Sequence, residues 1–183
     1  GLSMPSVRFA VEFTPIGNDC GFDRSGCDQI RFTMSANAGE ELGRISRIAS
    51  GGELSRIMLA MKNVFAENDP VQTMIFDEID TGVSGVAAQR VGEKLFQVSL
   101  GKQVMCVTHL PQIAAMADSH YIIKKEERSG RTYTDVLPLD KEGRLRELAR
   151  LHGGDNITDL TLASAAEQLE NAAKFKETVK NRP

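Results

Sequence analysis

Two short apolar segments, separated by one amphipathic segment, constrain the fold of this chain most. The segments 71–76 and 104–107 are apolar runs with no polar face, as is typical of strands buried on both sides of a sheet. Between them, apolar residues recur at helical spacing over 86–98. A strand, a helix and a strand in this order predict parallel pairing through a right-handed crossover, and therefore an α/β fold.

The segments on either side of this unit predict more strands and helices. Apolar and polar residues alternate over 7–13 and again over 30–34, which predicts two strands that pair antiparallel. The other predicted elements are a helix from about Leu54 to Asn68, a short helix over 111–117, a hairpin of 121–125 with 133–137, and helices over 143–151 and 158–176. We therefore expect a mainly parallel sheet flanked by helices, with antiparallel hairpin strands added to it.

Length and composition restrict the class of protein. The chain has 183 residues, 41% of them hydrophobic, and a net charge of -3, which fits one soluble domain with a substantial core. Its sequence has no apolar run long enough to span a membrane, and three cysteines are too few for a disulfide framework. We expect residues 1–6 to be a cloning remnant or linker, 7–176 to form one lobe, and 177–183 to be a flexible tail.

Three polar clusters stand at predicted element ends, where α/β proteins place their sites. The first is Ser50-Gly51-Gly52-Glu53, directly before the helix predicted to start near Leu54. Glycines allow close backbone approach and a helix N-terminus offers unpaired N–H groups, so this cluster suits a phosphate. An ordinary helix cap of serine and glycine explains the same residues equally simply.

The second cluster, Asp77-Glu78-Ile79-Asp80, follows the first apolar strand directly. A carboxylate at the end of such a strand is well placed to hold Mg²⁺, directly or through water. A neighbouring carboxylate can then orient or deprotonate an attacking water. The alternative is a solvated acidic turn, but adjacent carboxylates repel each other and are commonly compensated by a cation, which favours a functional site.

The third cluster contains His109, which follows the second apolar strand after Thr108. A histidine in this place can contact a phosphate, and it can equally well cap the helix that follows it. Because consecutive parallel strands bring their carboxyl ends together, we expect the second and third clusters to share one edge of the sheet.

These clusters match motifs of a known family. The segment 48–56, IASGGELSR, resembles the signature motif of ABC-type ATPases, and 73–78, TMIFDE, resembles their Walker B strand. Residues 79–85 are similar to the D-loop of these ATPases, and His109 is similar to their switch histidine. The longer runs FDEIDTGVSG (76–85) and CVTHLPQIA (106–114) resemble, more narrowly, the SMC-like DNA-repair ATPases of bacteria. The resemblance covers about residues 29–169.

The resemblance implies ATP and Mg²⁺ as cofactors and assigns catalytic roles. Asp77 would hold Mg²⁺ through water, and Glu78 would be the general base that polarises the attacking water. His109 would contact the γ-phosphate. The family therefore implies an ATPase that works in DNA repair and recombination at double-strand breaks, in the bacterial cytoplasm and at the nucleoid.

The resemblance also implies a second head in an ATP-dependent homodimer. Four signature residues would reach the ATP bound by the opposite head: Ser50, Gly51, Gly52 and Glu53. Glu53 would also organise the signature helix, together with Arg56. Asp80 and Ser84 would lie at the dimer seam. ATP binding would hold the two heads together, and hydrolysis would release them.

One part of the family pattern is missing from this sequence. No G-x-x-x-x-G-K-[ST] motif occurs, because Gly101-Lys102 is followed by Gln103 and lacks the first glycine. The sequence also lacks sustained heptads that would form a coiled coil. In the SMC-like family the phosphate loop lies in an N-terminal lobe beyond a coiled coil. We therefore expect a C-terminal lobe that partners its own N-terminal lobe and coil, is inactive alone, and meets DNA only through the whole protein.

Other functions fit parts of the pattern. The chain can be the head lobe of another SMC- or ABC-type ATPase, a pure dimerisation module, or a metal-dependent nuclease or topoisomerase-primase-like domain that uses Glu53, Asp77 and Asp80. A serine hydrolase with His109 is a further alternative, although Ser84 lacks the final glycine of G-x-S-x-G. Between 121 and 150, eight basic and six acidic residues are mixed, which is typical of a solvated surface more than of a DNA groove.

Overall fold

The computed structural model describes residues 7–17, 21–35, 39, 41–45, 51–65, 70–128 and 130–181. Its strands are β1 (Arg8–Pro15), β2 (Asp28–Ser35), β3 (Gly43–Arg44), β4 (Thr73–Phe76), β5 (Gln103–Cys106), β6 (Tyr121–Arg128) and β7 (Arg131–Pro138). Its helices are α2 (Gly51–Phe65), α3 (Gly85–Ser99), α4 (Pro111–Ala114), α5 (Lys141–Gly153) and α6 (Asp159–Lys180). Residues 177–180 therefore belong to the last helix. None of the described helices is long and apolar enough to cross a membrane.

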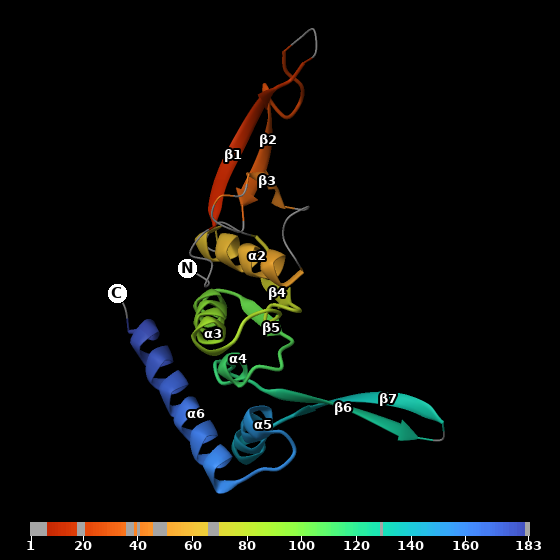
Figure 1. Ribbon diagram of the computed structural model, residues 1–183, viewed down its shortest axis with the longest axis vertical. Helices are drawn as coiled ribbons and strands as arrows, with labels where there is room; N and C mark the ends of the chain where they lie inside the picture. Colours follow the sequence, from red (N-terminus) through yellow and green to blue (C-terminus); the bar gives the residue numbers. More distant parts are fainter. Residues whose placement is uncertain are drawn as a thin grey trace.

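The described strands form three small sheets. The pair β4–β5 is parallel and is connected through α3, as the strand–helix–strand pattern predicts. The sheet β1–β2–β3 and the hairpin β6–β7 are antiparallel, and Figure 1 shows them extending away from the helical body. The predicted α/β class is confirmed. Antiparallel ladders nevertheless outnumber the parallel one among the described strands, because the flanking strands pair within their own sheets.

The pair β4–β5 is covered by helices on one face only. Met74 and Phe76 point into a core, each with 7% of its surface exposed, whereas Ile75 is 70% exposed and Met105 54% exposed. The prediction that both strands are buried on both sides is therefore wrong for this chain. The described helices pack against one face of the two strands, and the large apolar side chains of the other face meet no described layer.

The core on the covered face joins three helices to the two strands. Its buried members are Leu59, Met74, Phe76, Ile79, Val91, Leu95, Val98 and Ile113. They come from α2, β4, the turn after β4, α3 and α4, so this single cluster fixes the ends of both strands relative to the helices. Close packing of this kind makes the strand-end turns a rigid support for functional side chains.

A second cluster packs α4 against α5 and α6. Leu148, Ala149, Ala165 and Ala172 are at most 3% exposed, and the small alanines let the helices approach closely. The guanidinium of Arg144 donates to the carbonyl oxygens of Ala115 (2.7 Å) and of 117 (2.6 Å), which closes the carboxyl end of α4. Helix α4, which follows the predicted histidine cluster, is therefore held in place by α5 and α6.

The antiparallel sheet at the N-terminal end has one apolar face. The register places Phe9, Val11 and Phe13 of β1 opposite Met34, Phe32 and Ile30 of β2, so all six side chains share a face. Phe9 and Phe32 stack with ring centroids 5.6 Å apart. Five of the six remain more than 40% exposed. The predicted antiparallel pair is confirmed, and β3, which the sequence pattern did not indicate, adds two residues to its edge.

Candidate functional site

The acidic cluster forms a tight turn at the carboxyl end of β4. The Glu78 backbone N–H donates to Asp77 Oδ1 at 2.9 Å, and the Thr81 N–H donates to the Glu78 carbonyl at 3.1 Å. Glu78 has φ of 56°, and among the described non-glycine residues no other has a positive φ. Left-handed backbone at such a residue costs about 1–2 kcal/mol, so the surrounding contacts hold it in place. The turn presents both Asp77 and Glu78 to solvent.

These two carboxylates fit a magnesium ion of the kind that binds with a nucleotide. Mg²⁺ is commonly held by one or two carboxylates together with water and phosphate oxygens. Among the described residues, no group of three histidine, cysteine or acidic side chains gathers to hold a metal ion by itself. Asp77 and Glu78 are both exposed at the strand end, where water and phosphate oxygens can complete the coordination.

Asp80, the third carboxylate of the cluster, turns the other way. It is 5% exposed, and its Oδ2 accepts from the Thr108 hydroxyl at 2.6 Å and from the His109 backbone N–H at 2.9 Å. The same oxygen lies 3.0 Å from Nδ1 of the His109 ring. The structure therefore joins the second and third predicted clusters through Asp80.

His109 stands at the end of β5 with its ring 75% exposed. The backbone carries it there because the Val107 N–H donates to the Phe76 carbonyl at 3.0 Å, which continues the β4–β5 pairing one residue past the strands. The expectation that the two clusters share one sheet edge is therefore confirmed. Within the described part of the chain, no serine hydroxyl is hydrogen-bonded to this imidazole, which the serine hydrolase alternative requires.

Helix α2, which begins in the predicted signature segment, packs directly against the acidic turn. A Cβ added at Gly52 would lie 2.8 Å from the Thr81 Cβ and carbonyl oxygen and 3.0 Å from the Glu78 carbonyl, so only glycine fits there. The Ser55 hydroxyl donates to the Asp77 carbonyl at 3.2 Å, and the Arg56 guanidinium donates to the Thr81 carbonyl at 2.7 Å. The helix therefore fixes the backbone of the turn from outside the sheet.

The start of α2 corrects one prediction. The described helix includes Gly51 and Gly52, although the sequence pattern placed this cluster before a helix starting near Leu54. The low helix propensity of glycine hides the first turn from a pattern of apolar residues. Ser50, and the side chain of Glu53, lie outside what the structure describes, so their predicted contacts to ATP stay predictions.

Ser84 lies where the turn passes into α3. It is exposed and holds the N-cap position of that helix in extended backbone, but its side chain makes no capping hydrogen bond. Gly85 follows it with a φ of 50°. The predicted place of Ser84 and Asp80 at a dimer seam stays a prediction, and of the two, only Ser84 has an exposed side chain.

The thiol of Cys106 lies beside this site on the covered face of β5. Burial, and to a smaller extent the neighbouring carboxylates Asp80 and Asp77, raise the pKa of Cys106 to about 12. The thiol is therefore protonated at neutral pH, which disfavours a role as a nucleophile.

Sequence reasoning named the residue types of the site but missed how they are connected. The bonds from Ser55 and Arg56 to the turn, and the bond from Asp80 to the histidine segment, join residues 22 to 29 positions apart. No local pattern signals such contacts. A usable signal was the parallel register, which pairs Phe76 with Cys106 and so sets the two following turns side by side.

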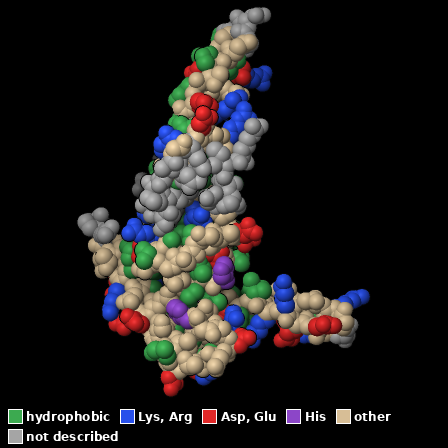
Figure 2. All heavy atoms as spheres, in the orientation of Figure 1, with side chains coloured by type: hydrophobic (Ala, Val, Ile, Leu, Met, Phe, Trp, Pro, Cys, Tyr) green, Lys and Arg blue, Asp and Glu red, His purple; other side chains and the backbone are tan. Residues whose placement is uncertain are grey.

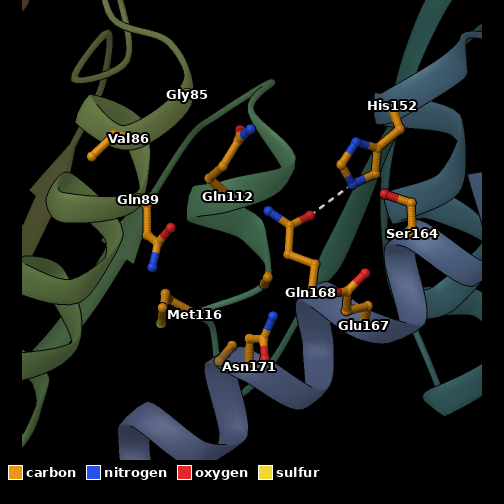
Figure 3. Close-up of a pocket in the computed structure, with 12 residues that line it drawn as sticks. Gly85, Val86, Gln89, Gln112, Met116, His152, Ser164, Glu167, Gln168 and Asn171 are labelled. Atoms are coloured by element: carbon orange, nitrogen blue, oxygen red, sulfur yellow. Dashed lines mark hydrogen bonds between the residues drawn. The ribbon is translucent and has the colours of Figure 1, made fainter.

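A separate cavity of about 470 Å³ lies between α3, α4, α5 and α6 (Figure 3). Its polar lining is dominated by amides such as Gln112, Gln168 and Asn171, and Gln168 Oε1 lies 2.7 Å from His152 Nε2. None of the predicted site residues lines it, although Gly85 does. The predicted catalytic groups lie instead on the open end of β4–β5.

The hairpin β6–β7 carries charges of both signs along its length (Figure 2). The Arg128 guanidinium is 2.7 Å from a carboxylate oxygen of Glu126 and 2.9 Å from one of Asp135. Such exposed mixed pairs contribute little binding energy and leave little net positive charge for a phosphate backbone. The hairpin therefore matches the solvated surface that the sequence indicated.

Comparison with curated proteins gives close relatives along almost the whole chain. DNA repair protein RecN of Bacillus subtilis (strain 168) is 49% identical to this chain over 162 residues. These residues are 88% of this chain and 28% of the relative. The corresponding values are 46%, 96% and 31% for RecN of Halalkalibacterium halodurans, and 44%, 94% and 31% for RecN of Treponema pallidum. The chain thus spans less than a third of the length of these relatives. No family profile matches it.

Solved structures agree on the fold. The Smc head domain with a coiled coil and joint from Pyrococcus yayanosii matches 81% of this chain and 26% of its own at a TM-score of 0.56 and 24% identity. A Smc head domain from Pyrococcus furiosus, with an extended coiled coil and bound to the C-terminal domain of ScpA, matches 80% of this chain and 34% of its own at a TM-score of 0.51 and 24% identity. These matches confirm the predicted fold of an SMC-type head.

Proposed function

The chain belongs to the RecN family of DNA repair proteins, of whose length it covers 28% to 31% in the relatives named above, and we propose that it forms the C-terminal lobe of an ATP-hydrolysing head. The observation that carries this proposal is the meeting of Asp77, Glu78 and His109 at one end of β4–β5, with the signature helix packed against the same turn. The whole protein would act in repair at DNA double-strand breaks.

In this proposal the exposed carboxylates divide the chemistry of ATP hydrolysis. Asp77 would hold Mg²⁺ through water, and the bound ion would neutralise charge on the phosphates. Glu78, held in left-handed backbone by the turn, would accept a proton from the attacking water. His109, exposed on the neighbouring strand end, would contact the γ-phosphate.

The signature cluster would serve a second head. The N-terminal turn of α2 offers backbone N–H groups to an anion, and Ser50, Gly51, Gly52 and Glu53 would reach the ATP bound by that head. Ser84 is exposed beside the turn and, with Asp80, would lie near the seam between the heads. Hydrolysis would then depend on dimerisation, because each site is completed by the partner.

The lobe that carries the phosphate loop would cover the bare face of β4–β5. This sequence has no such loop, and Ile75 and Met105 expose 70% and 54% of their surface there. Parallel strands are ordinarily covered on both faces, so a further layer is expected. We propose that the protein's own N-terminal lobe, joined through a coiled coil, supplies this layer and also the phosphate loop that binds ATP.

The chain by itself is therefore expected to bind ATP weakly and not to hydrolyse it. Equilibrium dialysis and a phosphate-release assay on the purified chain would measure both. Micromolar affinity together with steady turnover would contradict the assignment of a half site.

The proposal is tested most directly by Glu78→Gln in the full-length protein. The amide keeps the size of the side chain but removes the base, so turnover should fall by at least about 100-fold while ATP binding persists. Size-exclusion chromatography with ATP and Mg²⁺ should then show an accumulated dimer. The matched control is Glu127→Gln on the exposed hairpin, which should leave both unchanged. Near-normal turnover in the Glu78 variant would rule out this residue as the base.

A further inference from the structure

We infer that Asp80 is a positioning residue that fixes the orientation and tautomer of His109. This inference deepens the proposed function and rests on it for the meaning of His109, but the geometry that carries it lies within this chain. The contact of Asp80 with His109 Nδ1 spans 29 residues and joins the two strand ends of the site.

The Asp80 carboxylate is buried and needs hydrogen-bond partners. At 5% exposure, a carboxylate without partners would be strongly unfavourable. Its Oδ2 is instead surrounded by the Thr108 hydroxyl at 2.6 Å, the His109 backbone N–H at 2.9 Å and the His109 ring Nδ1 at 3.0 Å. All three donors come from one segment, so the carboxylate and this segment determine each other's positions.

The contact with Asp80 also sets the tautomer of the His109 ring. A carboxylate only accepts hydrogen bonds, so a ring nitrogen at 3.0 Å from it must carry the proton. The proton of neutral His109 therefore sits on Nδ1, and Nε2 is left on the opposite edge of a ring that is 75% exposed. Because the backbone N–H of the same residue is bonded to the same oxygen, the carboxylate is held within hydrogen-bond reach of the ring.

Asp80 also links His109 to Glu78, the proposed general base. Asp80 is two residues after Glu78 in one turn, where the Val83 N–H donates to the Asp80 carbonyl at 3.3 Å. The Thr108 hydroxyl also accepts from the Leu110 N–H at 3.1 Å, which ties the carboxylate to the start of α4. Asp80 thus sets Nε2 of His109 at a fixed place relative to Glu78, which is what an in-line attack on a phosphate requires.

The test that does not depend on ATP is nitrogen NMR of the purified chain labelled with ¹⁵N-histidine, at a pH where the ring is neutral. His109 should show a protonated Nδ1 and a bare Nε2. In Asp80→Ala, which removes the acceptor of the Nδ1–H bond, this tautomer should lose its dominance. Thr108→Val is the matched control, because it removes the hydroxyl and keeps the carboxylate, so the Nδ1–H form should persist. Circular dichroism checks that each variant is folded.

The result that would overturn the inference is an Nε2–H tautomer in the unmodified chain, or an unchanged Nδ1–H form in folded Asp80→Ala. The first reading needs no variant, so the inference stays testable if Asp80→Ala does not fold. In the full-length protein, Asp80→Ala should lower kcat for ATP by about 10-fold or more with little change in KM, since positioning and not binding is lost. An inactive wild-type protein would count against the proposed function alone and leave the NMR result standing.

Discussion

The two faces of the β4–β5 pair differ sharply in this chain. On the covered face, Met74 and Phe76 are 7% exposed and join the buried core of three helices. On the other face, Ile75 and Met105 of the same two strands are mostly exposed. The bare face also carries the polar Thr73 and Gln103, which are hydrogen-bonded to each other at 3.0 Å. The large apolar side chains of the two faces therefore differ in what covers them, and not in their residue type.

This contrast explains how half of a site can be well formed. The turns that carry Glu78, Asp80 and His109 are held from the covered side, through the core and through the contacts of Gly52 and Arg56. The bare face contributes nothing to these contacts. The turns of the proposed site can therefore keep their geometry in this chain, while nucleotide binding would depend on the layer that is proposed to cover the bare face.

Two isoleucines provide the largest expected difference between the faces. Ile79 is 0% exposed in the core and Ile75 is 70% exposed on the bare face. Ile79→Ala should lower the free energy of unfolding by about 2–5 kcal/mol, because it leaves a cavity, whereas Ile75→Ala should cost less than about 1 kcal/mol. Urea unfolding of the purified chain, followed by circular dichroism, measures both values.

The same pair also tests the proposed covering lobe. In the full-length protein, Ile75→Ala should become several times more costly, because the side chain is then buried by the added layer. Equal costs for Ile75→Ala in the chain and in the full-length protein would show that the face stays bare, and the covering lobe would have to lie elsewhere.

Gly52 allows the support of the acidic turn to be broken without touching a catalytic group. A Cβ there would lie 2.8 Å from the Thr81 carbonyl oxygen and 3.0 Å from that of Glu78, and backbone atoms cannot swing aside. Gly52→Ala should therefore cost about 1–3 kcal/mol, despite the higher helix propensity of alanine. Gly101→Ala is the control, since its Cβ would meet nothing within 4 Å, and it should change stability by about 0.5 kcal/mol or less. Similar unfolding midpoints for the two variants would contradict the tight packing of α2 on the turn.

The sequence predicted the elements of this fold better than their surroundings. Periodicity located α3, the parallel strands and the hairpin, and α6 begins within one residue of its predicted start, where Thr158 caps it with a capping box. The exposure of one face of β4–β5 could not be predicted from the sequence, because an apolar run has the same composition whether a helix of this chain or another lobe covers it. The first turn of α2 was hidden by glycines, which carry no apolar period.

For the proposed site, the motif resemblance predicted roles for Asp77, Glu78 and His109, and the parallel register brings these residues to one edge. The inward turn of Asp80 was not predictable, because adjacent carboxylates in a sequence give no sign of which one is buried. Its direction is set by the Thr108 and His109 donors, which belong to a strand 29 residues further along.

The smallest expected effect concerns Cys106, which sits on the covered face next to exposed Met105. Burial and the nearby carboxylates raise the pKa of the Cys106 thiol to about 12, so at pH 8 only about one thiol in ten thousand is the reactive thiolate. In a Cys20→Ser background, iodoacetamide should modify exposed Cys27 at least about 100-fold faster than Cys106, as measured by mass spectrometry of the two peptides. Because the pKa is raised, the rate at Cys106 should still climb about tenfold per pH unit between pH 8 and 10. Equal modification rates of Cys27 and Cys106 at pH 8 would mean that the covered face opens readily to solvent. The two faces of β4–β5 would then differ much less in their protection from solvent than the structure indicates.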